Sequence, residues 1–84
     1  MTTNRKNNAP QPTAAETYAA RRNDIARLLD VLDQHLANHA EAAKADPANW
    51  GHAGDLGKVR GDLINTVAFM AGMDPEMVEA FLAE

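Results

Sequence analysis

Apolar side chains recur every three or four residues between residues 13 and 45, which is the spacing of one face of an α-helix. No glycine or proline interrupts this segment. Thr13 and Glu16 stand three residues apart at its start, as in a capping box, so we predict one long helix over about 13–45. Its apolar stripe comprises Tyr18, Ile25, Leu28, Leu29, Leu32, Leu36, Ala40 and Ala43.

Residues 46–55 are expected to form a turn. The segment opens on Asp-Pro, and the residue before a proline disfavours the helical conformation. It also holds two glycines, which adopt positive φ without steric cost. A second helix is predicted over about 55–71, with Asp55 or a residue just before it as its N-cap. We expect Trp50 to close the open end of the resulting hairpin.

The second predicted helix carries a ridge of small residues. Gly57 and Gly61 lie one turn apart in this ridge, although each costs about 1 kcal/mol relative to alanine inside a helix. A helix tolerates that cost where another backbone packs closely against it. We therefore expect the ridge to be a site of helix–helix contact.

A short third helix is predicted over about 75–83, because Asp74 suits an N-cap and Pro75 suits the first helical position. Gly72 is expected to end the second helix as its C′ residue. We expect Phe69 to pack against the third helix.

The junction between these two helices matches the small–glycine–aliphatic spacing of a helix-turn-helix motif, in Ala68, Gly72 and Val78. A recognition helix presents basic or amide side chains to DNA. Residues 75–84 instead carry three acidic side chains and no basic one. We therefore interpret the junction as a structural corner between two helices.

Together these elements predict an all-α fold, an antiparallel helical hairpin with a short third C-terminal helix. Residues 1–12 are polar and hold two prolines, so we expect a disordered tail, with residues 13–84 as a single helical domain. A two-helix hairpin covers only one side of each helix. We therefore expect a homodimer in which two hairpins form a four-helix bundle. A monomeric three-helix bundle, in which the third helix covers the spare face, is the alternative.

Composition narrows the range of functions. The chain has 84 residues and 45% hydrophobic residues, but alanine supplies 17 of them, so the core is expected to be small. Cysteine is absent, which excludes disulfides and thiolate metal sites and fits a reducing compartment such as the cytoplasm. Serine is absent as well, and we expect no enzymatic activity and no cofactor. No apolar run is long enough to predict a membrane span or a signal peptide.

Charge is distributed unevenly around a net value of −4. Residues 28–84 carry ten acidic side chains against three basic ones, so most of the chain would repel a phosphate backbone, and a nucleic-acid partner is disfavoured. The N-terminal end is basic, which keeps a small DNA-associated regulator as an alternative. The candidate basic patch comprises Arg5, Lys6, Arg21, Arg22 and Arg27.

Three histidines allow a second alternative, a His-based metal-binding protein. His35 and His39 lie four residues apart on one helix face, and His52 follows across the turn with Asp55 nearby. The pair lacks the glutamate of an H-E-x-x-H motif, because Leu36 follows His35. His39 also lies at the edge of the apolar stripe, where a hydrogen-bonded histidine is the usual outcome. We therefore expect no metal.

The favoured function is a non-enzymatic protein–protein interaction or regulatory module. Arg60 falls in the apolar sector of the second helix, where we expect it to pair with Asp30, Asp33 or a carboxylate of a partner chain. Aromatic side chains at a loop tip often anchor interfaces. The candidate contact residues are Trp50, His52, Arg60, Phe69 and Phe81.

One segment is similar to the turn of small, uncharacterised bacterial helical-hairpin proteins, several of which are encoded on plasmids or other mobile elements. It comprises Asn49, Trp50, Gly51, His52, Ala53, Gly54, Asp55 and Leu56, and runs into Val59. The resemblance covers about a quarter of the chain. It implies a helical hairpin and an accessory or regulatory role on another protein, and it transfers no catalytic residue.

Overall fold

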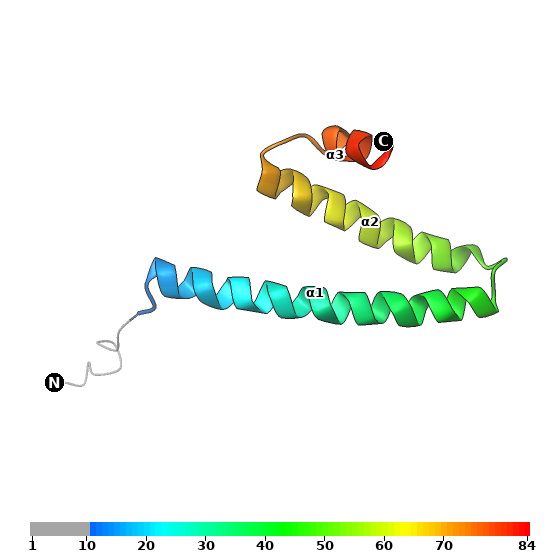
Figure 1. Ribbon diagram of the computed structural model, residues 1–84, viewed down its shortest axis with the longest axis horizontal. Coiled ribbons are helices and arrows are strands. Elements are labelled where there is room, and N and C mark those ends of the chain that lie inside the picture. Colours follow the sequence, from blue (N-terminus) through cyan, green and yellow to red (C-terminus); the bar gives the residue numbers. More distant parts are fainter. Residues whose placement is uncertain (1–10) are drawn as a thin grey trace. The chain divides into compact units, whose positions relative to one another are not determined.

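The computed structural model describes residues 11–84, which are helical in three segments and contain no strand (Figure 1). The helices are α1 (Ala14–Ala45), α2 (Trp50–Ala71) and α3 (Pro75–Leu82). The expected all-α class is therefore confirmed. Two compact units meet between Asn38 and His39, and α1 runs through this boundary. Ten of the twelve residues of the expected tail, residues 1–10, lie outside the described part.

The start of α1 is the predicted capping box. The Thr13 backbone N–H donates to Glu16 Oε1 at 2.9 Å, and the Glu16 backbone N–H donates to Thr13 Oγ1 at 3.0 Å. These two bonds satisfy amides that have no partner within the first turn of a helix. The helix therefore begins at Ala14, one residue from the predicted start, and ends at Ala45 as predicted.

Helix α2 begins at Trp50, five residues before its predicted start, and Asn49 rather than Asp55 is its N-cap. The Gly51 backbone N–H donates to Asn49 Oδ1 at 2.8 Å, while Asn49 Nδ2 donates to Asp46 Oδ2 at 3.0 Å. Asparagine is among the strongest N-cap residues. Gly51 and the next glycine, at position 54, are helical rather than turn residues, so the connection between α1 and α2 is only four residues long.

The early start of α2 also corrects the role expected of Trp50. This residue occupies the first position of the helix, and its side chain is 85% exposed. A side chain fixed on a helical turn lacks the freedom of a loop residue to fold back between helices. Trp50 therefore does not close the end of a hairpin.

A structural corner joins α2 to α3, as the spacing of Ala68, Gly72 and Val78 predicts. Gly72 has φ 67° and ψ 36°, in the left-handed region, and its N–H donates to the Phe69 carbonyl at 3.3 Å. The N–H of Met73 donates to the Ala68 carbonyl at 3.0 Å, which completes a Schellman motif. Asp74 then precedes Pro75, the first residue of α3, as predicted.

The core of this corner is small. Its buried members are Ile64 and Ala68 of α2 and Val78 of α3. Phe69 does not pack against α3 as expected, and its side chain is 82% exposed. Ile64 and Ala68 lie one turn apart on the face of α2 that meets α3, whereas Phe69 projects about 100° away from Ala68 around the helix.

The glycine ridge of α2 has no neighbour within the unit formed by residues 39–84. A Cβ atom added at Gly54, Gly57 or Gly61 would meet no heavy atom within 4 Å there. The expected close helix contact is thus not made by the residues of this unit.

No helix within residues 11–84 combines the length and the apolar composition needed to cross a membrane.

Candidate functional site

Two histidines and an aspartate form the densest cluster of chemically active groups in the described residues. His39 lies on the C-terminal part of α1, while His52 and Asp55 lie three residues apart on α2. Because α2 begins at Trp50, His52 and Asp55 occupy successive turns of one helix and face the same side. The position of the Asn49 cap is therefore what aligns these two side chains.

The three side chains are close enough to share one bound atom. His39 Nε2 lies 3.0 Å from Asp55 Oδ2. The rings of His39 and His52 meet edge to face, with centroids 5.3 Å apart and planes at 88°. One ligand atom from each of the three side chains lies within 4.8 Å of the other two.

His39 is held in a half-buried position, with 24% of its side chain exposed, whereas Asp55 is 68% exposed. The Nδ1 atom of His39 is buried and has no hydrogen-bond partner among residues 11–84. A buried polar atom without a partner costs free energy of folding and is uncommon in proteins. The hydrogen bond to Asp55 therefore satisfies only Nε2, one of the two nitrogen atoms of the His39 ring.

The cluster differs from the set of histidines singled out in the sequence. His35 is exposed one turn earlier on α1, and Asp55 takes its place beside His39 and His52. The expected hydrogen bond of His39 is confirmed, but the residue is half-buried and does not belong to the core. Asp55 was noted near His52 but was assigned to a helix cap, so its contact with His39 was not predicted. The signal that finds it is the His52–Asp55 spacing, once Asn49 is recognised as the cap.

Arg60 forms an ion pair that sequence analysis did not predict. Its Nη2 atom lies 3.0 Å from Glu79 Oε1 on α3, so the expected pairing with Asp30 or Asp33 is not the one that the structure shows. Both side chains are more than half exposed, and the pair lies beside the small core of the α2–α3 corner.

A second ion pair lies within α2. The Lys58 ammonium donates to Asp62 Oδ2 at 2.6 Å, and this bond raises the pKa of Lys58.

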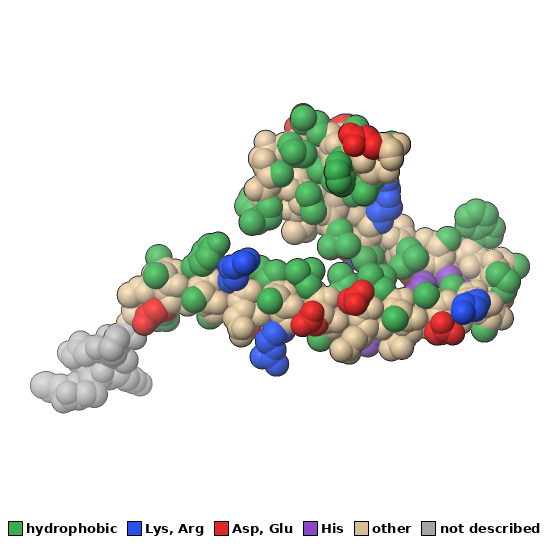
Figure 2. All heavy atoms as spheres, in the orientation of Figure 1, with side chains coloured by type: hydrophobic (Ala, Val, Ile, Leu, Met, Phe, Trp, Pro, Cys, Tyr) green, Lys and Arg blue, Asp and Glu red, His purple; other side chains and the backbone are tan. Residues whose placement is uncertain are grey.

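Three of the candidate contact residues are exposed aromatic side chains, Trp50, Phe69 and Phe81. His52, a fourth candidate, is half-buried beside His39. Figure 2 shows hydrophobic side chains gathered over α3 and the adjoining end of α2. We call this surface the α2–α3 patch; it comprises the exposed side chains of Phe69, Met70, Met73, Met77, Phe81 and Leu82.

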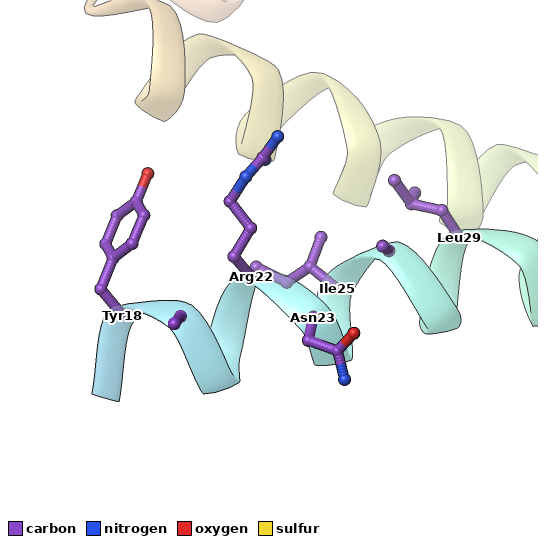
Figure 3. A pocket seen from close by; sticks show the side chains of 7 residues that line it. Tyr18, Arg22, Asn23, Ile25 and Leu29 are labelled. Carbon is purple, nitrogen blue, oxygen red and sulfur yellow. The ribbon is translucent and has the colours of Figure 1, made fainter. Parts of the chain in front are cut away.

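The candidate basic patch does not form one surface on α1. Arg22 lies on the same side of the helix as Tyr18, Ile25 and Leu29, with which it lines an open depression (Figure 3). Arg27 projects about 140° away from Arg22 around the helix. Arg21 projects about 100° from Arg22 and about 120° from Arg27 around the helix. The other two members of the patch, Arg5 and Lys6, lie outside the described residues.

No polar or charged side chain is fully buried within residues 11–84. The depression shown in Figure 3 is lined by residues of α1 alone, from Tyr18 to Leu29. The described residues that could bind a cation are therefore His39, His52 and Asp55, which offer nitrogen and oxygen lone pairs. The apolar helix faces offer contact area to another protein surface.

No protein-family profile, curated protein or solved structure matches this chain.

Proposed function

We propose that this chain is a non-enzymatic interaction module that dimerises. In this proposal α1 and α2 form an antiparallel hairpin, two hairpins form a four-helix bundle, and the α2–α3 patch binds another protein. The hydrogen bond between His39 of α1 and Asp55 of α2 supports the hairpin, because it joins residues 16 positions apart on either side of the short connection.

One observation carries the proposal: the described chain buries very little of its apolar surface. Its buried side chains are those of Ile64, Ala68 and Val78. Large hydrophobic side chains are exposed along all three helices and in the connection between α2 and α3, at Tyr18, Ile25, Leu28, Leu29, Val31, Trp50, Leu56, Leu63, Val67, Phe69, Met70, Met73, Met77, Phe81 and Leu82. Burying each would contribute about 1.5–3 kcal/mol, and exposed apolar area on this scale is typical of protein interfaces.

A second copy of the chain is the partner best suited to the helix faces. The first unit contributes a single amphipathic helix segment up to Asn38, which cannot cover its own apolar stripe. The ridge at Gly57 and Gly61 is open, and small residues let a helix of another copy approach closely. A chain of 84 residues with so small a core is in the size range where oligomerisation commonly supplies the missing stability.

A binding role fits the chemistry of the chain better than catalysis does. Serine and cysteine nucleophiles are absent from the sequence. Among the described residues, the carboxylates are exposed rather than enclosed in a dry pocket, where their pKa values would be tuned for acid–base work. An accessory or regulatory protein requires only a surface that a partner recognises.

Light scattering coupled to size-exclusion chromatography tests the dimer. We expect a mass of twice the 9.1 kDa chain over a tenfold range of concentration. A mass of 9.1 kDa throughout that range would contradict self-association.

A pair of charge substitutions tests which face of α1 is used. Leu29 lies on the apolar stripe, so Leu29→Glu should shift the mass to that of one chain while helix content by circular dichroism is retained. Gln34→Glu places the same charge on the polar side of α1 and should leave the dimer intact. Equal behaviour of the two variants would show that the stripe is not the interface.

A further inference from the structure

His39, His52 and Asp55 combine two ligand types that bind divalent transition metals. Imidazole nitrogen suits Zn²⁺ and its neighbours in the first transition row, and a carboxylate oxygen completes many such sites. The three groups come from two helices and lie within 4.8 Å of one another. We infer that they form a binding site for a divalent first-row transition-metal ion, with Zn²⁺ as the representative ion.

The separation of His39 and Asp55 is close to that of two ligands on one metal. Two ligands about 2.1 Å from a tetrahedral Zn²⁺ lie about 3.4 Å apart. His39 Nε2 and Asp55 Oδ2 are 3.0 Å apart, so a metal ion can replace the proton that they share after a movement of a few tenths of an ångström. The ring proton then resides on Nδ1 of His39.

His52 supplies the third ligand after a modest side-chain movement. Its ligand nitrogen lies within 4.8 Å of the other two ligand atoms and must approach them by about 1.4 Å at most to reach tetrahedral spacing. The edge-to-face arrangement with His39 leaves the two rings unstacked, so rotation about the side-chain bonds of His52 can deliver this shift. A water molecule would occupy the fourth position.

The electrostatic environment favours a cation on balance. The first turn of α2 carries the partial positive charge of a helix N-terminus, which opposes cation binding. The Asp55 carboxylate lies in the site itself, and residues 39–84 contain eight acidic side chains against three basic ones. The acidic surplus raises the local concentration of divalent cations.

His35 provides an internal control, because it is a histidine on the same helix that lies outside the cluster. It also represents the competing site, a chelating pair of His35 and His39 at helical i, i+4 spacing. Substitution of His52 disrupts the inferred site but keeps the hydrogen bond between His39 and Asp55, so the variant should retain its fold.

The test is isothermal titration calorimetry of the full chain, stripped of metal with EDTA, against ZnCl₂. We expect one Zn²⁺ per chain for the wild type and for His35→Ala. For His52→Ala and Asp55→Ala we expect the affinity for Zn²⁺ to fall by at least about tenfold. Circular dichroism of each variant checks that helix content is unchanged, and visible absorption of added Co²⁺ should report tetrahedral coordination only where Zn²⁺ binds.

Three results would overturn the inference. They are no Zn²⁺ binding by the wild type, wild-type affinity in His52→Ala, and loss of binding in His35→Ala to the same degree as in His52→Ala. Each can be obtained whether or not the chain dimerises, because the three ligands belong to one copy.

Discussion

At the scale of single residues, the Asn49 side chain determines where α2 begins and therefore where Asp55 lies on this helix. Its side chain accepts from the Gly51 N–H and donates to Asp46, so it caps the start of α2 and links this start to the first residue of the connection. Asp55, which also suits a cap, is thereby left within the helix and next to His39. One capping choice therefore produces the candidate site.

Val78 is the residue that α3 contributes to the small core of the α2–α3 corner. Val78→Ala removes two buried methyl groups, and we expect the free energy of unfolding to fall by about 1.5 kcal/mol in urea denaturation. Met77→Ala, at the neighbouring and exposed position, should change it by less than about 0.5 kcal/mol. Equal effects would show that Val78 is not a core residue.

At the scale of helices, the sequence predicted the features that depend on local chemistry. The capping box of α1, the left-handed Gly72 and the Asp74–Pro75 start of α3 all follow from a few neighbouring residues, and all three are confirmed. The start of α2 was placed wrongly because two competing caps lie six residues apart. The glycines between them permit a turn or a helix, and hydrogen bonding to Asp46 favours the helix.

The side-chain partners were harder to predict than the helices. Arg60 had carboxylates within reach on more than one helix, and the periodicity of α2 does not say which helix lies beside it; the structure pairs it with Glu79. Asp55 was expected near His52, but its contact with His39 could be predicted only once the register of α2 was known. Contacts between helices depend on packing angles that no single helix encodes.

Two glycine substitutions should have opposite effects on α2. Gly72→Ala places a side chain at φ 67°, and we expect it to lower the free energy of unfolding by about 1 kcal/mol. Gly54→Ala lies in a helical segment with open space around an added Cβ, and we expect a gain of up to about 1 kcal/mol when it is combined with Leu29→Glu, in which no second copy packs on the glycine ridge. Both are measured by urea denaturation. A stabilising Gly72→Ala would contradict the Schellman corner.

At the scale of the whole molecule, the exposed apolar faces and the small core imply that stability comes in part from association. If the proposed dimer is the folded form, unfolding is coupled to dissociation and the melting temperature depends on concentration. We expect the midpoint to rise by about 5 °C or more when the protein is concentrated a hundredfold. The midpoint of Leu29→Glu should stay constant over the same range, and a constant wild-type midpoint would argue for a self-sufficient monomer.

The glycines of α2 lower the stability of this helix and should therefore shorten the lifetime of copies that have no partner. Four of the 22 residues of this helix are glycines, at positions 51, 54, 57 and 61, which together cost about 4 kcal/mol of helix propensity relative to alanine. A helix so costly to maintain opens readily when nothing covers it, and open segments are where proteases cut. The abundance of this protein would then follow the supply of its binding partner, since unpaired copies would be degraded first.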